Sequence, residues 1–190
     1  MACSELLHGQ SFYVGIIGGG SFTYGFSERV LGEAPPKTVI YPTERDYLVG
    51  PTIEVGLPRR IALGFEALYR PLNQTAATLL ADGSLRSISP ATVVTWELPV
   101  LVRYRFTEER WQPLLEAGPS FRTAGNLNAS SPSSKGIALG VGLRARIGVA
   151  RVTPTFRYTR WASDPLYAIA ARTNRNQVVF LLGISFGGSW

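Results

Sequence analysis

The sequence has few of the residues on which metal, disulfide and nucleophilic chemistry depend. Cys3 is the single cysteine and His8 the single histidine among 190 residues. One cysteine excludes an intrachain disulfide and a cysteine-based metal centre, and no cofactor is expected. His8 precedes every strand predicted below, so a Ser-His-acid triad cannot be assembled from strand residues. These absences predict a protein that is not an enzyme.

Charge is scarce, and lysine is nearly absent. Charged residues make up 17% of the chain against 45% hydrophobic residues, and only Lys37 and Lys135 of the 19 basic residues are lysine. Arginine suits partly buried ion pairs because its planar fork holds a carboxylate at two points. The net charge of +6 would suit nucleic acid, but the basic residues are dispersed singly rather than gathered in a patch. No nucleic-acid partner is therefore expected.

No run in the sequence has the composition of a membrane-spanning helix. The longest uncharged run, residues 9–27, is broken by glycines and serines. Residues 1–10 lack the apolar core of a secretory signal. An exported protein needs such a signal, so we expect the given sequence to be a mature form or a reading frame that starts late.

A strict two-residue alternation is the dominant pattern, and it is clearest in residues 95–106. Every second side chain there is apolar or aromatic, and most of those between are polar or charged. This period predicts a β-strand with one apolar and one polar face. Twelve residues at about 3.3 Å each are enough for a tilted strand to cross a bilayer. The apolar set is Trp96, Leu98, Val100, Val102, Tyr104 and Phe106.

Eight segments carry this alternation, and the connections between them are alternately long and short. Even strand number, short turns at one end and long loops at the other are typical of bacterial outer-membrane barrels. The sequence therefore predicts an all-β, eight-stranded antiparallel up-and-down transmembrane β-barrel over residues 11–190. Residues 1–10 would form an N-terminal periplasmic segment. The predicted strands are 11–20, 47–57, 61–72, 95–106, 111–122, 136–149, 152–159 and 177–186.

Three connections have specific signals. Asp82-Gly83, within the long connection 73–91, resembles the tip of a hairpin that extends beyond the barrel. Ala150-Arg151 is expected to form a tight turn between two strands. The connection 27–46 is expected to be long and polar, with a break at Pro35-Pro36.

The aromatic residues favour an arrangement in which the apolar face points outward to lipid. They gather near both ends of the strands, as the girdles of membrane barrels do. The polar face is rich in glycine, alanine, serine and threonine, which suits a crowded lumen. A soluble barrel with its apolar face around a ligand is the alternative. The predicted girdles are Tyr69, Trp96, Phe121, Tyr158 and Trp161 by the long loops, and Phe12, Phe106, Trp111, Phe186 and Trp190 by the short turns.

With that arrangement, the charged residues of the strands point inward. An unpaired charge in a dry lumen would cost about 3–5 kcal/mol, so a connected ion-pair network is expected. An eight-stranded barrel is just wide enough for its side chains to fill, which favours a plugged lumen over a gated ion path. The predicted lumen network is Glu54, Glu66, Glu116, Arg103, Arg144, Arg146 and Arg157, and a second cluster nearer the loops is Glu97, Arg70 and Arg122.

In architecture the chain resembles the small eight-stranded outer-membrane barrels, which include the membrane domain of outer membrane protein A, outer membrane protein X and the opacity-type adhesins. The final strand, VVFLLGISF, has the alternating apolar residues and late aromatic that the barrel-assembly machinery reads in that class, although this chain continues to Trp190. The resemblance carries no catalytic motif.

The resemblance implies a non-enzymatic protein of the bacterial outer membrane with a role in envelope structure, adhesion or limited solute passage. Implied partners are outer-membrane lipid and lipopolysaccharide, the assembly machinery during insertion, and an unknown partner of the outer loops. A soluble ligand-binding barrel and an outer-membrane lipid-modifying enzyme are the alternatives.

Overall fold

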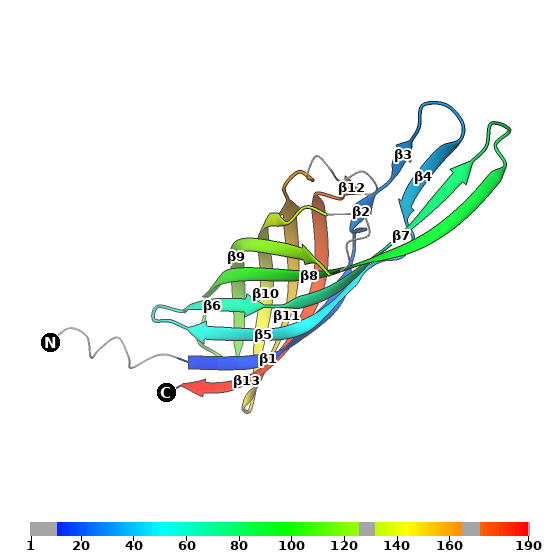
Figure 1. Cartoon of the computed structure of the whole chain (residues 1–190). Coiled ribbons are helices and arrows are strands. Elements are labelled where there is room, and N and C mark those ends of the chain that lie inside the picture. Colours follow the sequence, from blue (N-terminus) through cyan, green and yellow to red (C-terminus); the bar gives the residue numbers. More distant parts are fainter. Residues whose placement is uncertain (1–10, 126–131, 165–171, 190) are drawn as a thin grey trace.

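A computed structural model describes residues 11–125, 132–164 and 172–189 (Figure 1). Within these residues no helix is long and apolar enough to cross a membrane. The predicted N-terminal segment 1–10 and Trp190 lie outside the described residues. The strands are β1 (Ser11–Ser21), β2 (Phe26–Ser27), β3 (Arg29–Leu31), β4 (Lys37–Pro42), β5 (Tyr47–Gly56), β6 (Ile61–Glu66), β7 (Leu68–Leu79), β8 (Leu85–Arg105), β9 (Trp111–Ala124), β10 (Lys135–Ile147), β11 (Ala150–Trp161), β12 (Arg172–Thr173) and β13 (Asn176–Ser189).

The long strands form a closed antiparallel barrel. β1 pairs with β5 on one side and with β13 on the other, from Ser11 opposite Ser189 to Ser21 opposite Val179. β6 and β7 together form one strand of the barrel wall, interrupted at Ala67. Each remaining neighbour in the wall is also the neighbour in sequence. The predicted eight-stranded up-and-down barrel is thus confirmed, and closure pairs the strand edges that lipid could not solvate.

The structure also confirms which face points outward. On β8 and β10, the side chains of Leu98 and Leu139 are 40% and 52% exposed, whereas Glu66 on β6 is only 5% exposed. The apolar side chains therefore coat the outside of the barrel and the charged side chains fill its lumen. A barrel with its apolar face around an inner ligand, the alternative raised by the alternation, is wrong for this chain.

The predicted turn at Ala150-Arg151 is wrong, because the chain turns two residues earlier. Gly148 has a φ of 60°, a left-handed conformation that glycine adopts without steric cost. The ladder between β10 and β11 then continues through Arg146 opposite Arg151 and Ile147 opposite Ala150. Arg151 consequently belongs to a wall strand, and its side chain is buried in the lumen.

At the long-loop end, the barrel sheet extends outward, and β3 and β4 join the extensions of β7 and β8 there (Figure 1). β7 and β8 continue beyond the wall as a hairpin, and its tip includes Gly83 with a φ of 80°, as the Asp82-Gly83 signal predicts. The connection 27–46, predicted without strands, contains β3 and β4. β4 pairs with β7 from Lys37 opposite Leu79 to Pro42 opposite Gln74, and β3 pairs with β4. We call β3, β4, residues 74–79 and residues 85–91 the outer sheet.

Candidate functional site

The middle of the lumen holds six charged side chains from six different strands, which we call the mid-lumen cluster. Arg103 on β8 lies at its centre. Its Nη1 donates to Glu54 Oε2 at 2.9 Å, its Nε donates to Glu116 Oε2 at 3.0 Å, and its Nη2 donates to Glu66. One guanidinium group therefore uses all three of its nitrogens on three carboxylates. The cluster consists of Glu54, Glu66, Glu116, Arg103, Arg144 and Arg157.

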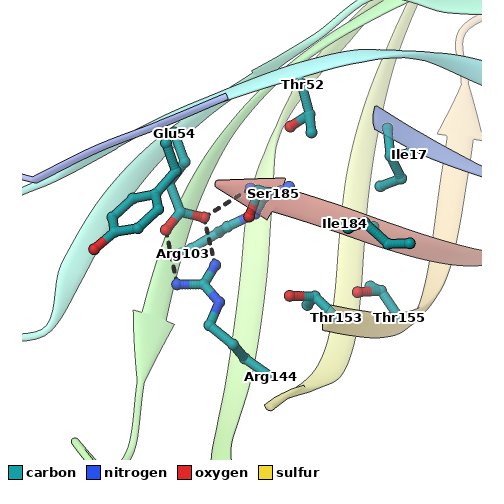
Figure 2. A pocket seen from close by; sticks show the side chains of 11 residues that line it. Ile17, Thr52, Glu54, Arg103, Arg144, Thr153, Thr155, Ile184 and Ser185 are labelled. Carbon is teal, nitrogen blue, oxygen red and sulfur yellow. Dashed lines mark hydrogen bonds and ion pairs between the residues drawn. The ribbon is translucent and has the colours of Figure 1, made fainter. Parts of the chain in front are cut away.

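Two further arginines complete the pairing. Arg157 Nη1 donates to Glu66 Oε2 and Arg157 Nε donates to Glu116 Oε1, both at 2.7 Å. Arg144 Nη1 donates to Glu54 Oε1 at 2.7 Å, and Figure 2 shows the Glu54 carboxylate bonded to both Arg144 and Arg103. Three carboxylates thus face three guanidinium groups, so the cluster is neutral. Neutrality and dense hydrogen bonding are what allow these charges to stay buried.

Glycines opposite the cluster make room for its long side chains. A Cβ at Gly140 would lie 2.7 Å from Glu116 Oε1, and a Cβ at Gly64 would lie 2.9 Å from Arg103 Cζ. Both distances are shorter than side chains tolerate. The excess of glycine in the sequence therefore has a local cause, since the wall must come close to the filling of a narrow barrel.

A second cluster, the outer cluster, lies nearer the long loops. Arg70 pairs with Glu97 at 2.9 Å and with Asp46 at 3.0 Å, and Arg122 pairs with the same Glu97 oxygen at 2.7 Å. Gln177 Oε1 accepts from Arg70 at 2.7 Å and from Arg122 at 3.0 Å. Two carboxylates again balance two guanidinium groups. Asp46 and Gln177 were not predicted here, although both have inward parity: Asp46 directly precedes β5 and has the parity of Glu54, and Gln177 has the parity of the buried Val179.

Trp161 is a correction to the predicted aromatic girdle. It is 1% exposed, its indole N–H donates to Gln177 Oε1 at 2.9 Å, and the Arg122 guanidinium lies 3.7 Å from its ring centroid. Trp161 therefore belongs to the outer cluster in the lumen. The alternation of β11 predicts this inward direction, because Trp161 has the same parity as the inward Arg157.

Arg146 is a correction to the predicted lumen network. Its side chain is exposed, and it makes no ion pair among the described residues. Alternation gives Arg146 the inward parity of Arg144, but it lies one pleat further along β10, at the open short-turn end. Arg151, which the misplaced turn concealed, is the additional buried arginine, and its Nη1 lies 3.7 Å from Glu54 Oε1.

Apolar side chains separate the two clusters inside the barrel. Asp46 directly precedes β5, whose inward residues then pass from Leu48 to Glu54, and along β7 Leu68 lies just before Arg70. These leucines pack together with residues of β1 and β13. An ion crossing the lumen would have to leave one charged level and cross this apolar layer before reaching the next. The layer consists of Ile17, Leu48, Leu68, Val179 and Leu181.

A small cavity adjoins the mid-lumen cluster. Its volume is about 20 Å³, and Ile17, Thr52, Glu54, Arg144 and Ser185 are among its lining residues (Figure 2). That is enough for about one water molecule. None of the outer-cluster residues Asp46, Arg70, Glu97 and Arg122 lines it.

Comparison with known proteins agrees with this geometry at the level of fold. No protein-family model and no curated protein matches the chain. Among solved structures, the outer membrane protein OprG from Pseudomonas aeruginosa is similar, with a TM-score of 0.55 and 15% identity over 96% of each chain. The chain has the fold of the small eight-stranded outer-membrane β-barrels.

Two other structures are also similar to the barrel. The N-terminal β-barrel domain of Pseudomonas aeruginosa OprF has a TM-score of 0.50 and 13% identity, over 94% of this chain and 98% of that one. Neisserial surface protein A has a TM-score of 0.48 and 15% identity, over 94% and 97%. Structural similarity at identities this low supports a shared fold but gives no information on function.

Apart from Trp161, the described aromatics of the predicted girdles lie on the outside of the barrel or at its rims. Tyr69 and Trp96 pair across β7 and β8 with ring centroids 5.7 Å apart at the long-loop end. Phe106 packs against Tyr104 at 5.3 Å near the short turns. The others on or near the outer surface are Phe12, Trp111, Phe121, Tyr158 and Phe186.

The described part of the chain contains no group of three or more His, Cys, Asp and Glu side chains that could hold a metal ion. Cys3 and His8 lie outside it. Each carboxylate of the two lumen clusters pairs with at least one arginine. Each of these carboxylates is therefore engaged in an ion pair within the filled lumen.

Proposed function

We propose that this protein is a non-enzymatic, integral barrel of the bacterial outer membrane. Its lumen is plugged by the mid-lumen cluster, and its outer sheet recognises a partner at the cell surface. The neutral, fully connected mid-lumen cluster is the observation that carries the proposal, because a lumen filled by ion pairs leaves the outside of the barrel as the working surface. Limited solute passage would need this cluster to open.

Lipid contact is the role we propose for the outer apolar face. The two levels of aromatics, one including Trp96 and the other Phe106, would lie at the two membrane interfaces, where amphipathic rings are favoured. Lipopolysaccharide and other outer-membrane lipids would surround the belt between them. During insertion, the outward apolar residues of β13, with Phe186 near its end, would be read by the barrel-assembly machinery.

Recognition is the role we propose for the outer sheet. It extends more than five residues beyond the Tyr69 and Trp96 pair, and side-chain hydrogen bonds tie it together. The hydroxyl oxygens of Thr38 and Thr78 lie 3.2 Å apart. Those of Thr43, which directly follows β4, and Thr75 lie 2.8 Å apart. The sheet nevertheless exposes apolar side chains, including Val30 and Ile88. Ordered, exposed apolar groups outside the membrane favour contact with another molecule.

Membrane location is tested by fractionating cells that make the protein and by comparing gel mobility before and after boiling. A folded barrel in the outer-membrane fraction should migrate differently once heated. A protein that stays dispersed without detergent would contradict the proposal and favour a soluble barrel.

The plugged lumen is tested separately by planar-bilayer recording. The natural protein should show no conductance steps, whereas Glu66→Ala should conduct, because it opens the lumen and leaves Arg103 and Arg157 short of a partner. Steps from the natural protein would favour solute passage instead. A change in lipid A structure when the protein is made would overturn the non-enzymatic assignment.

The outer sheet is tested by replacing residues 29–42 with a short Gly-containing turn. The shortened barrel should still show heat-dependent mobility, but cells bearing it should lose adhesion to surfaces coated with lipopolysaccharide or to one another. Arg59→Gln at the opposite end is the matched control. Unchanged adhesion by both variants would contradict the recognition role and leave the barrel assignment intact.

A further inference from the structure

A polar hollow opens at the short-turn end of the lumen, below the mid-lumen cluster. Its volume is about 450 Å³, and residues of β1, β8, β9, β10, β11 and β13 line it. Three of the lining side chains are arginines. We call this hollow the short-turn vestibule, and the lining residues that matter are Tyr13, Arg105, Glu108, Arg146 and Arg151.

The vestibule carries positive charge that no lumen carboxylate balances. Its one acidic lining residue, Glu108, is an exposed side chain that pairs with Arg60 at 3.1 Å. The nearest buried carboxylate, Glu54, already accepts from Arg103 and Arg144. Arg151 reaches it only at 3.7 Å. Arg105, Arg146 and Arg151 therefore add charge to a lumen whose other arginines are already balanced.

Two of these arginines also hold donors without an acceptor. Arg105 Nε and Arg151 Nη1 are buried and have no hydrogen-bond partner among the described residues. Arg151 is only 6% exposed, and it is held in place because its guanidinium stacks 3.3 Å from the Tyr13 ring centroid and donates to the Tyr13 hydroxyl. A buried charged donor without an acceptor is costly unless a ligand supplies one.

We infer that the short-turn vestibule binds a phosphate-type oxyanion, either as a free ion or as the headgroup of a lipid on that side of the membrane. Guanidinium forks pair with phosphate oxygens at two points, and three forks converge on one hollow. The polar volume is far larger than a single water needs, so a phosphate ester fits as well as the bare ion. This inference does not depend on what the outer sheet recognises.

The experiment uses the full chain refolded in a maltoside detergent, which contains no phosphate. Inorganic phosphate is titrated at constant ionic strength, with sodium chloride as the balancing salt, and binding is followed by calorimetry and by the NMR signals of the arginine Nε–H groups. Saturable binding with shifts at Arg105, Arg146 and Arg151 is expected. Arg105→Gln combined with Arg146→Gln should weaken binding by about tenfold or more, because charge-assisted hydrogen bonds are lost.

Arg110→Gln is the matched control, because it removes the same charge from an exposed position at the same end without altering the lining. Phosphate affinity should be unchanged in this variant. Equal weakening by Arg110→Gln, or the same Nε–H shifts when chloride is added in place of phosphate at equal ionic strength, would mean that net charge alone attracts the ion and would overturn the site. Heat-dependent mobility confirms that each variant is folded.

A second arm identifies the source of the phosphate. In phosphatidylglycerol bilayers without free phosphate, shifts at Arg146 would mean that a headgroup occupies the vestibule. Shifts that appear only when inorganic phosphate is added to micelles would mean that the free ion is the ligand. Both results support the site, and a lack of response in both arms overturns it.

Discussion

The mid-lumen cluster and the short-turn vestibule are built from the same residue type on the same strands, yet they differ in electrostatic balance. Arg103 and Arg144 are buried in a neutral network, whereas Arg105 and Arg146 lie two residues further along β8 and β10. Two residues of strand amount to about 6.6 Å. Arg103 is a buried partner of three carboxylates, whereas Arg105, at that distance along β8, lines an open hollow.

This difference shows that depth in the barrel, more than residue type, decides what an inward arginine does. At mid-depth the surrounding wall excludes water, so each charge needs a partner and the chain supplies it. At the rim the hollow is open, so a surplus of charge is tolerated and remains free to hold an anion.

Removing a mid-lumen carboxylate should be the most damaging change. Glu66→Ala takes one partner from both Arg103 and Arg157, and breaking a buried pair from one side costs about 3–5 kcal/mol of unfolding free energy. The measurement is a urea titration read by unboiled gel mobility. Glu108→Ala, which removes an exposed carboxylate of the vestibule, is the control and should cost less than about 1 kcal/mol. Similar losses of unfolding free energy for the two variants would contradict the electrostatic difference between the mid-lumen cluster and the vestibule.

Adding one methyl group should destabilise the protein at the mid-lumen cluster but not at the vestibule. Gly140→Ala would place a Cβ 2.7 Å from Glu116 Oε1, and the carboxylate cannot move without breaking its ion pairs. We expect a loss of about 1–3 kcal/mol, as for overpacked cores. Gly188→Ala in the vestibule has no heavy atom within 4 Å of the new Cβ and should change stability by less than about 0.5 kcal/mol. The same urea titration tests both, and a tolerated Gly140→Ala would show that the network is loosely packed.

The outer cluster extends the comparison to a third level. Trp161→Phe removes the indole donor to Gln177, but Gln177 Oε1 still accepts from Arg70 and Arg122. The expected loss is therefore about 1 kcal/mol, the net value of one hydrogen bond. Trp96→Phe on the outer face is the matched substitution and should have a smaller effect on the urea midpoint. A larger shift of the urea midpoint for Trp96→Phe would contradict the assignment of Trp161 to the outer cluster.

The smallest effect is expected at the rim. Arg146→Gln should alter unfolding free energy by less than about 0.5 kcal/mol, because the side chain is exposed. Arg144→Gln, one pleat deeper, should cost about 1.5–3 kcal/mol, because Glu54 loses a charged donor. Equal costs in the urea titration would mean that Arg146 is part of the mid-lumen cluster after all.

The two-residue alternation of the sequence predicted the fold well, because the backbone sets locally the direction of successive side chains along a strand. In the segment 95–106, alternation separated an apolar face from a polar one, and the aromatic residues near the strand ends assigned the apolar face to lipid. The eight repeats of that pattern with alternating connections predicted a closed barrel. The same parity rule assigned Arg103, Arg144 and Arg157 to the lumen. Parity contains no information on depth, however, so it grouped Arg146 with them although the rim leaves that residue in the vestibule.

The errors have specific causes. The turn between β10 and β11 was placed after Gly148 instead of at it, and this concealed Arg151. Trp161 was assigned to the girdle from its position near a strand end, although its parity pointed inward. Asp46 lies at the end of the predicted connection 27–46 and Gln177 at the start of the last predicted strand, and parity does not show that both reach Arg70 until the neighbouring strands are in place. The outer sheet was missed because β3 and β4 are short and depend on the extension of β7 for pairing.

The eight wall strands, their closure and the alternation of two faces along each strand could be predicted from the sequence, because they follow from a two-residue period that the pleated backbone enforces. Which charges meet, at which depth, and which arginines lack a balancing carboxylate became known from the three-dimensional arrangement. Strands in a barrel are tilted and staggered, so residues far apart in sequence share one level of the lumen. Ion pairing depends on that level, and no single strand contains it.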